Sequence, residues 1–215
     1  MTPSALRSAV ADLLAASGLD STAAQLEALA QFVELLQRWN TTYNLTALRN
    51  ADLMLVSHLS DCLAAISTLQ RKCSNGSLLD VGSGGGLPGL VFAIMLPRLQ
   101  VTCLDAVGKK AAFVRQAAAS LQLTNLEAVH ARVESWHGGP FDVVASRAFS
   151  SLPEFVSLSR HLLKPTGVWM AMKAKIPHAE IERLLHDVAV FHVEPLEVPG
   201  LNAKRCLVWL RSNAK

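Results

Sequence analysis

The chain has 215 residues, of which 51% are hydrophobic and 17% are charged, so it can bury a core and is not intrinsically disordered. Its 20 Lys and Arg residues against 17 Asp and Glu residues give a formal net charge of +3. That balance excludes a histone-like polycation, but it permits an enzyme that presents one basic face to nucleic acid.

The cysteines and the apolar stretches indicate the compartment. Cys62, Cys73, Cys103 and Cys206 lie far apart without a C-x-x-C pair, which excludes a zinc ribbon or thioredoxin motif and does not indicate a disulfide framework. No stretch approaches the roughly 20 apolar residues that span a bilayer. Asp12 interrupts the apolar start, unlike a signal peptide. We expect a cytoplasmic monomer that holds no metal and contacts no membrane.

The first third of the chain has helical patterning. An Ala- and Leu-rich helix over residues 4–16 should end at Gly18. A second helix should begin at Asp20 or Ser21, both good N-caps, and run to about Trp39. A third is predicted over residues 51–69, where apolar side chains form one stripe.

From residue 77 onward, short apolar strands alternate with helices. This alternation predicts a mostly parallel sheet covered on both faces. The last two strands have no helix between them, so one antiparallel strand should lie at or near the end of the sheet. Strands are expected at residues 77–81, 101–104, 126–130, 141–145, 168–172, 191–198 and 205–210, and helices at 87–96, with Pro88 in the first turn, 109–121, 152–163 and 178–187.

The most specific local pattern is a glycine loop. Residues 80–89 read DVGSGGGLPG between a predicted strand and a predicted helix. Glycine permits positive φ and a close approach of the backbone to a ligand, and the helix N-terminus offers unpaired N–H groups. Asp105 ends the next strand, 23 residues after Gly82, where a carboxylate can accept hydrogen bonds from ribose hydroxyls. The alternatives are a tight turn without a ligand and an Asp105 that caps the next helix.

The loop fits two nucleotide-binding patterns. Gly84, Gly86 and Gly89 satisfy G-x-G-x-x-G, which predicts an NAD(P)-binding oxidoreductase. Gly82, Gly84 and Gly86 behind Asp80 resemble motif I of class I S-adenosylmethionine methyltransferases. The position of Asp80 at the strand end, the LKPTG run at residues 163–167 and the expected antiparallel tail favour the second pattern. No Gly-Lys-Ser/Thr follows the glycines, which disfavours ATP hydrolysis.

Motifs along nearly the whole chain resemble one methyltransferase family. The sequence is similar to the RsmG (GidB) family of bacterial 16S ribosomal RNA methyltransferases. It departs from the family at Cys62, where Ser is usual, and at Gly85. The motifs that carry the resemblance are the glycine loop, Trp39-Asn40, Asn44-Leu45-Thr46-Ala47, the H-x-x-D segment from His58 to Asp61, Gly108-Lys109-Lys110, Arg132-Val133-Glu134 and Ser146-Arg147-Ala148-Phe149.

The resemblance implies a fold and a reaction. The fold would be the Rossmann-like class I methyltransferase fold, with a seven-stranded, mostly parallel sheet in residues 73–215 and a helical segment over residues 1–72 packed on it as one unit. The reaction would transfer the methyl group of S-adenosylmethionine to N7 of a guanine in the decoding region of 16S ribosomal RNA. Guanine N7 carries a lone pair and no proton, so the attack needs no general base and rests on proximity and orientation.

The resemblance also assigns roles to residues. Arg147 is the one candidate catalytic residue, as an orienting group. The expected substrate contacts are Asn40, Asn44, His58 and Lys173, within a distributed set of basic residues. The expected cofactor-binding residues are Asp80, Gly82, Gly84, Leu87, Asp105, Val133, Glu134 and Arg147.

Structural alternatives remain open for several of these residues. Leu87 and Val133 suit a core, Glu134 suits a solvated helix start, and Arg147 suits a surface ion pair. His58 shares a helix face with Asp61, three positions on, so the two fit a local packing pair as well as a site. A ribosome-binding module with an inactive nucleotide fold is the alternative to an enzyme.

Overall fold

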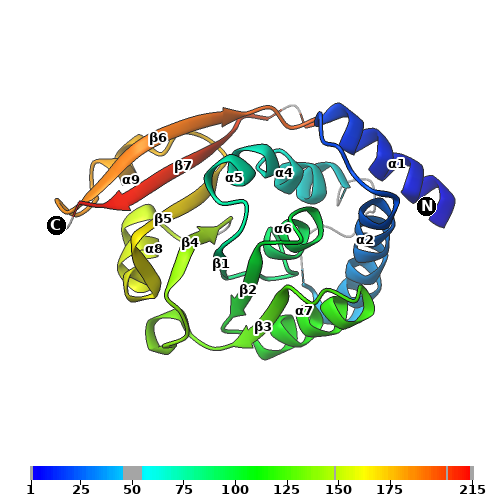
Figure 1. The fold of residues 1–215 in the computed structure, drawn as a ribbon, viewed down its shortest axis with the longest axis horizontal. Helices are drawn as coiled ribbons and strands as arrows, with labels where there is room; N and C mark the ends of the chain where they lie inside the picture. The colour runs from blue at the N-terminus through cyan, green and yellow to red at the C-terminus, as the bar shows by residue number, and fades with distance from the viewer. Residues whose placement is uncertain (1, 46–54, 148, 202, 214–215) are drawn as a thin grey trace.

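The computed structural model describes residues 2–45, 55–147, 149–201 and 203–213 (Figure 1). Two long helices, α1 (Pro3–Ala16) and α2 (Ala23–Tyr43), open the chain. A π-helical turn η1 (Leu55–Leu59), α4 (Ser60–Leu63) and α5 (Ile66–Lys72) then lead to the sheet.

A seven-stranded sheet forms the centre, in the order β3-β2-β1-β4-β5-β7-β6. Neighbours from β3 to β5 are parallel, and β7 is antiparallel to both β5 and β6, which confirms the predicted sheet. The strands are β1 (Ser77–Val81), β2 (Gln100–Asp105), β3 (Leu126–His130), β4 (Phe141–Ser146), β5 (Leu163–Lys173), β6 (Val188–Leu196) and β7 (Arg205–Ser212).

Side chains alternate between two apolar clusters, one on each face of the sheet. Leu78 and Val143 belong to the first cluster, whereas the next residues along the same strands, Leu79 and Val144, belong to the second. On the first face lie α2, α4, α5, α6 (Gly89–Met95) and α7 (Gly108–Ser120), and on the other lie α8 (Leu152–Ser159) and α9 (His178–Ile181) (Figure 1). Helices on both faces leave the edge at the carboxyl ends of the parallel strands for a ligand.

The N-terminal helices share the first cluster with the sheet. Phe32, Val33 and Leu36 of α2 are fully buried in it, and α2 contacts α6 and α7. Gln25 donates hydrogen bonds from Nε2 to the carbonyls of Ile94 and Met95, both at 3.1 Å, and so joins the start of α2 to the end of α6. The division of the chain at residue 72 stays a prediction.

Several predicted boundaries are wrong. The second helix is capped by Thr22, whose hydroxyl and Gln25 form a capping box, rather than by Asp20 or Ser21. Pro88 is the N-cap of α6 instead of lying in its first turn. The segment predicted as one helix over 51–69 is interrupted at residues 64 and 65, and its first four residues lie outside the described part of the chain.

The largest differences lie in the C-terminal third. The helix predicted over 178–187 has only four residues, because α9 buries no side chain that would support further turns. Strand β5 starts at Leu163 rather than 168, pairing Leu163 with Phe141 ahead of an irregularity in register. The preceding helix is therefore shorter than predicted, ending as α8 and a 3₁₀ turn, η3 (Arg160–Leu162).

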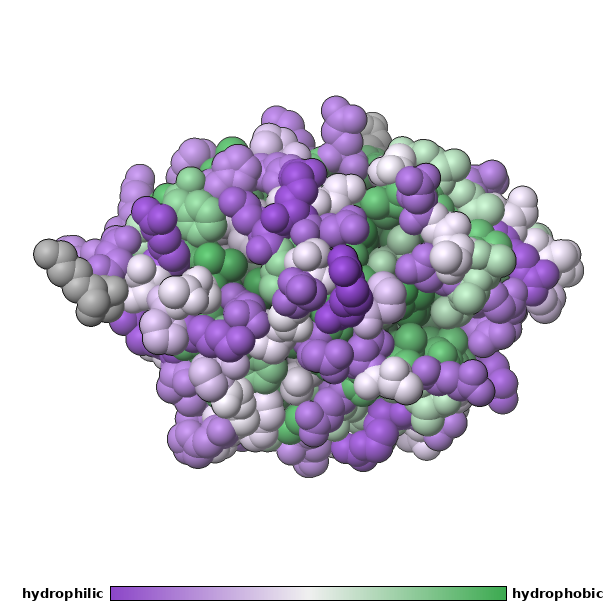
Figure 2. Space-filling model, viewed as in Figure 1, coloured by the Kyte–Doolittle hydropathy of each residue, from purple (hydrophilic) through white to green (hydrophobic). Residues whose placement is uncertain are grey.

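One face of the molecule, in the orientation of Figure 1, carries mostly hydrophilic side chains with smaller apolar groups between them (Figure 2). Within the described ranges, no helix combines the length and the apolar character that a membrane span requires.

Candidate active site

The glycine loop crosses the carboxyl ends of β1 and β2. Gly82, Gly84 and Gly86 all have positive φ, at 70°, 57° and 79°. The N–H groups of Gly82 and Ser83 donate to the carbonyl of Leu104 at 2.8 and 3.1 Å, which ties the loop to the end of β2. A Cβ placed on Gly84 would find its nearest neighbour only at 3.9 Å, so the loop backbone faces open space at that residue.

Asp105 holds the loop from the end of β2. Its Oδ2 accepts the N–H of Gly84 and its Oδ1 accepts the N–H of Val107, both at 2.8 Å. The second bond forms an Asx turn ahead of α7, whose N-cap is Val107, so Asp105 is not the cap of that helix. Each carboxylate oxygen keeps acceptor capacity, because an ionised oxygen offers about two lone-pair sites.

Asp80 lies below the loop and has no exposed surface. Its Oδ2 accepts the N–H of Gly89 at 2.8 Å, whereas its buried Oδ1 has no hydrogen-bond partner. Burial raises the pKa of Asp80 to about 7. The carboxyl group thus fixes the start of α6, and the expected role of Asp80 in cofactor binding stays a prediction.

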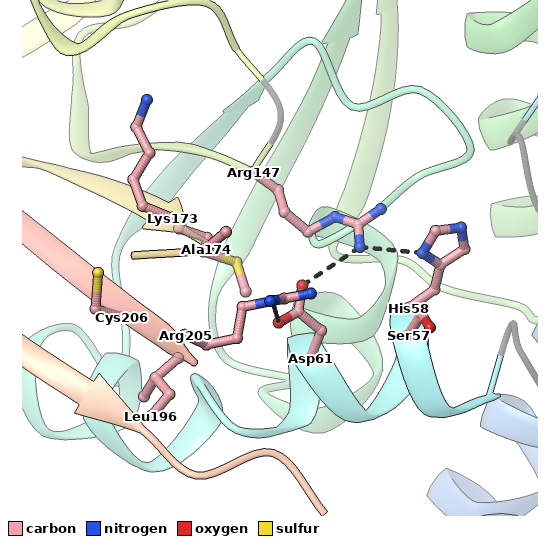
Figure 3. A pocket seen from close by; sticks show the side chains of 10 residues that line it. Ser57, His58, Asp61, Arg147, Lys173, Ala174, Leu196, Arg205 and Cys206 are labelled. Carbon is pink, nitrogen blue, oxygen red and sulfur yellow. Dashed lines mark hydrogen bonds and ion pairs between the residues drawn. The ribbon is translucent and has the colours of Figure 1, made fainter. Parts of the chain in front are cut away.

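Four charged or polar side chains meet at the carboxyl end of β4, namely His58 of η1, Asp61 of α4, Arg147 just after β4 and Arg205 of β7 (Figure 3). Asp61 accepts a hydrogen bond at Oδ1 from Arg205 Nε at 3.0 Å and pairs through Oδ2 with Arg147 Nη1 at 3.5 Å. Arg147 Nη1 also lies 3.2 Å from His58 Nδ1. Asp61 is 7% exposed, so the two arginines are held by one buried carboxylate. Arg147 is therefore not the surface ion-pair partner considered above.

His58 is a neutral hydrogen-bond acceptor in this cluster. Burial, with a further contribution from the Arg147 guanidinium, lowers the pKa of His58 to about 4. Because Nδ1 faces a guanidinium donor, the proton of the neutral ring belongs on Nε2. Within the described residues, His58 Nε2 and Arg147 Nε are both buried and without a hydrogen-bond partner. Both groups can donate to a ligand.

The cluster forms one wall of a cavity of about 430 Å³. Lys173, at the end of β5, lines the same cavity (Figure 3). Its Nζ donates to Glu180 at 2.9 Å and to the carbonyl of Ser150 at 3.3 Å. Met172, Leu196 and Cys206 supply the apolar part of the lining. The cavity lies at the carboxyl ends of β4 and β5, where open α/β sheets bind ligands.

The other predicted residues are placed as follows. Leu87 and Val133 are 4% and 5% exposed and belong to the two apolar clusters, as the core alternative requires. Glu134 is exposed and pairs with Arg132 at 3.7 Å. Asn40 is buried in α2, and Asn44 is the left-handed C-cap of that helix, with φ of 49°. Their roles as ligand contacts stay predictions, and Thr46, Ala47 and Ala148 lie outside the described residues.

Sequence reasoning assigned no specific role to two features of this site. Arg205 lies 144 residues after Asp61 and appeared only within a general set of basic residues. Met172 occupies a predicted strand without any polar signal. A spacing pattern cannot reveal either feature, because Arg205 reaches Asp61 and Met172 lines the cavity only once segments far apart in the sequence pack together.

Comparison with known proteins identifies the family. Residues 25–208 match the family described as GidB, rRNA small subunit methyltransferase G. The chain belongs to this family. Ribosomal RNA small subunit methyltransferase G of Acidovorax sp. (strain JS42) is 54% identical over 206 residues, which cover 91% of each chain. The protein of the same name from Albidiferax ferrireducens is 49% identical and covers 98% of this chain and 97% of its own.

This member of the GidB family also shares its fold with more distant methyltransferases. The ribosomal protein L11 methylase of Lactobacillus delbrueckii subsp. bulgaricus superposes with a TM-score of 0.55 at 13% identity, covering 71% of this chain and 78% of its own. Coclaurine N-methyltransferase, bound to N-methylheliamine and SAH, gives a TM-score of 0.57 at 9% identity, with 98% and 94% covered. At this identity the likeness concerns the fold alone, which is the predicted class I methyltransferase fold.

Proposed function

We propose that this protein transfers the methyl group of S-adenosylmethionine to N7 of a guanine in 16S ribosomal RNA. The observation that carries the proposal is membership of a small-subunit rRNA methyltransferase family over residues 25–208, with the glycine loop inside the matched region. The N7 position and the decoding region rest on the family resemblance of the sequence motifs.

The loop and Asp105 fit the cofactor's polar groups. The open space over Gly84 lets a ligand lie against the backbone, where any larger side chain would project and strain the positive φ. Asp105 has acceptor capacity left on both oxygens for two ribose hydroxyls. S-adenosylmethionine, when bound, supplies an activated methyl group on a sulfonium. Gly82, Gly84 and Asp105 would hold it at the carboxyl ends of β1 and β2.

The chain's own residues then provide orientation rather than proton transfer. Guanine N7 has no proton to lose, so the reaction needs no general base. The neutral His58 therefore has no proton to remove from the substrate. Arg147 is fixed by Asp61 and His58, and its unpartnered Nε is free to orient the cofactor's carboxylate or the substrate. Holding two reactants in line can lower the activation free energy by roughly 7–11 kcal/mol in favourable cases.

The assembly and location of the enzyme are also part of this proposal. We propose a monomer that acts in the cytoplasm, where its ribosomal substrate is made. We further propose that the helical segment 1–72 and residues 73–215 form one structural unit. The burial of Phe32, Val33 and Leu36 in the apolar cluster of the sheet supports this unit.

Two measurements test the function. Calorimetric titration with S-adenosylhomocysteine and, in parallel, with NAD should give saturable binding of the first only. Purified protein should then transfer labelled methyl groups to small subunits from cells that lack the modification, and the label should map to one guanine. Binding of NAD instead would assign the glycines to the dinucleotide pattern. Cofactor binding without any transfer would favour an inactive ribosome-binding module.

A further inference from the structure

Three adjacent hollows extend from the site along the loop between β5 and α9. Beside the cavity of about 430 Å³ lie two further hollows of about 650 and 580 Å³. The first two share Lys173 and Ala174, and the second and third share Lys175 and Ile176. Arg205 lines both the first and the third. The shared linings make the three hollows one surface, which we call the basic groove.

The groove concentrates positive charge. Its lining contains two carboxylates, Asp61 and Glu180, and both are already paired, with the two arginines and with Lys173 respectively. The whole chain, by contrast, has 20 basic and 17 acidic residues. The basic residues of the lining are Arg147, Lys173, Lys175, Arg183, Lys204 and Arg205.

Two of these cations are available to a partner. Lys175 and Lys204 are exposed and lie on different elements, one after β5 and one before β7, and both line the third hollow. Neither forms an ion pair within the part of the chain that the structure describes. Uncompensated charges along a groove raise the local positive potential and attract an anion that extends along it.

The groove lacks the large aromatic side chains on which unpaired bases most often stack. Among its described lining residues there is no Phe, Tyr or Trp. Single-stranded RNA held by its bases stacks them on aromatic side chains, whereas RNA held by its backbone needs only a track of cations. The lining therefore fits repeated phosphate groups better than it fits bases or an apolar peptide.

We propose that the basic groove holds the phosphodiester backbone of the RNA strand that enters the active site. This inference rests on the proposed function and adds the path of the substrate. The backbone runs past Lys175 and Lys204 and reaches the cluster of Asp61 and Arg147 at the carboxyl end of β4. Binding along this path is independent of base sequence, and the cofactor loop does not take part in it.

The test compares two charge-reversal variants with the same net charge. Lys175→Glu/Lys204→Glu changes the groove. Arg98→Glu/Arg211→Glu is the control. Arg98 precedes β2, and Arg211 lies near the end of the antiparallel strand β7. Both residues therefore lie at the amino ends of the parallel strands, whereas the groove lies at their carboxyl ends. Each variant lowers the net charge by four. The measured quantities are affinity for a protein-free transcript of the 16S decoding region over a range of salt concentrations, and calorimetric affinity for S-adenosylhomocysteine.

The groove variant should bind the transcript at least about tenfold more weakly. The negative slope of log affinity against log salt should become shallower by about 1.5, since each of the two lost phosphate contacts contributes roughly 0.7–0.9 to its magnitude. The control should stay within about twofold of the wild type at moderate salt. Both variants should bind S-adenosylhomocysteine normally. Equal RNA affinity and equal slopes for the two variants would overturn the proposal.

Two other outcomes separate the related hypotheses. If the groove variant binds the transcript normally but methylates assembled subunits poorly, the groove contacts a ribosomal protein, and the RNA path is wrong. If the wild type binds the transcript through the groove but transfers no methyl group, the proposed function fails while the groove remains an RNA-binding surface.

Discussion

Replacing Asp61 with Asn should destabilise the protein, because this carboxylate separates two guanidinium groups. Arg205 lies at 3.0 Å and Arg147 at 3.5 Å from it, and their side chains are 23% and 18% exposed. At an effective dielectric constant of about 20, the two attractions amount to roughly 10 kcal/mol before the cost of desolvation. Removing one partner of a buried pair costs about 3–5 kcal/mol net, and the partial exposure of both arginines places this site near 3 kcal/mol.

Urea unfolding, followed by circular dichroism, measures this loss. Glu134→Gln is the matched control, since Glu134 pairs with Arg132 at 3.7 Å but the two side chains are 46% and 75% exposed. The control should cost less than about 0.5 kcal/mol. Asp61→Asn should also lower kcat/KM, since Arg147 loses the charge that fixes it. A loss of stability no greater than that of Glu134→Gln would refute the view that Asp61 is a buried bridge.

Three further substitutions test the glycine loop and its supports. Gly84→Val should abolish S-adenosylhomocysteine binding in calorimetry while leaving the circular dichroism spectrum unchanged, since the side chain enters open space at a φ of 57°; normal binding would show that the ligand lies elsewhere. Gly89→Ala should cost about 1–3 kcal/mol in urea unfolding, because its Cβ would meet Cys103 Sγ and lie 2.9 Å from Asp80 Oδ2; an unchanged midpoint would show that this contact relaxes freely. Asp80→Asn should flatten the pH dependence of the free energy of unfolding. Burial raises the pKa of Asp80 from 3.8 to about 7, so the folded state favours the neutral carboxyl group. The free energy of unfolding of the wild type should therefore fall by up to about 4 kcal/mol as the pH rises from 3.8 to about 7. Equal slopes for Asp80→Asn and the wild type would contradict that assignment.

The sequence predicts the centre of the sheet well because β1, β2 and β4 are buried along nearly their whole length. Runs such as Leu78-Leu79 and Val143-Val144 are apolar on consecutive residues, which is typical of parallel strands. The helix over residues 178–187 was wrong for the opposite reason. Its apolar residues, such as Ile181, are only partly buried, so packing does not support a longer helix there.

The candidate site could be predicted in part. Gly84 and Asp105 follow from a local pattern whose geometry is set within one strand-loop-helix unit, and the structure joins them by a hydrogen bond of 2.8 Å. The hydrogen bond from Arg205 to Asp61 could not be predicted, because it connects a residue of α4 with a residue of β7 that lies 144 positions later in the chain. Likewise, the exposure of Glu134 and the full burial of Asp80 depend on tertiary packing, and motif spacing contains no information on either.

The central claim is methyl transfer to small-subunit ribosomal RNA. Its most direct test incubates the purified protein and labelled S-adenosylmethionine with small subunits that lack the modification, and then maps the labelled nucleotide. Gly84→Val serves as the variant without cofactor binding. The wild type should place label at N7 of a single guanine in 16S rRNA, and Gly84→Val should place none. No incorporation by a wild-type protein that binds the cofactor, or label on another molecule, would contradict it.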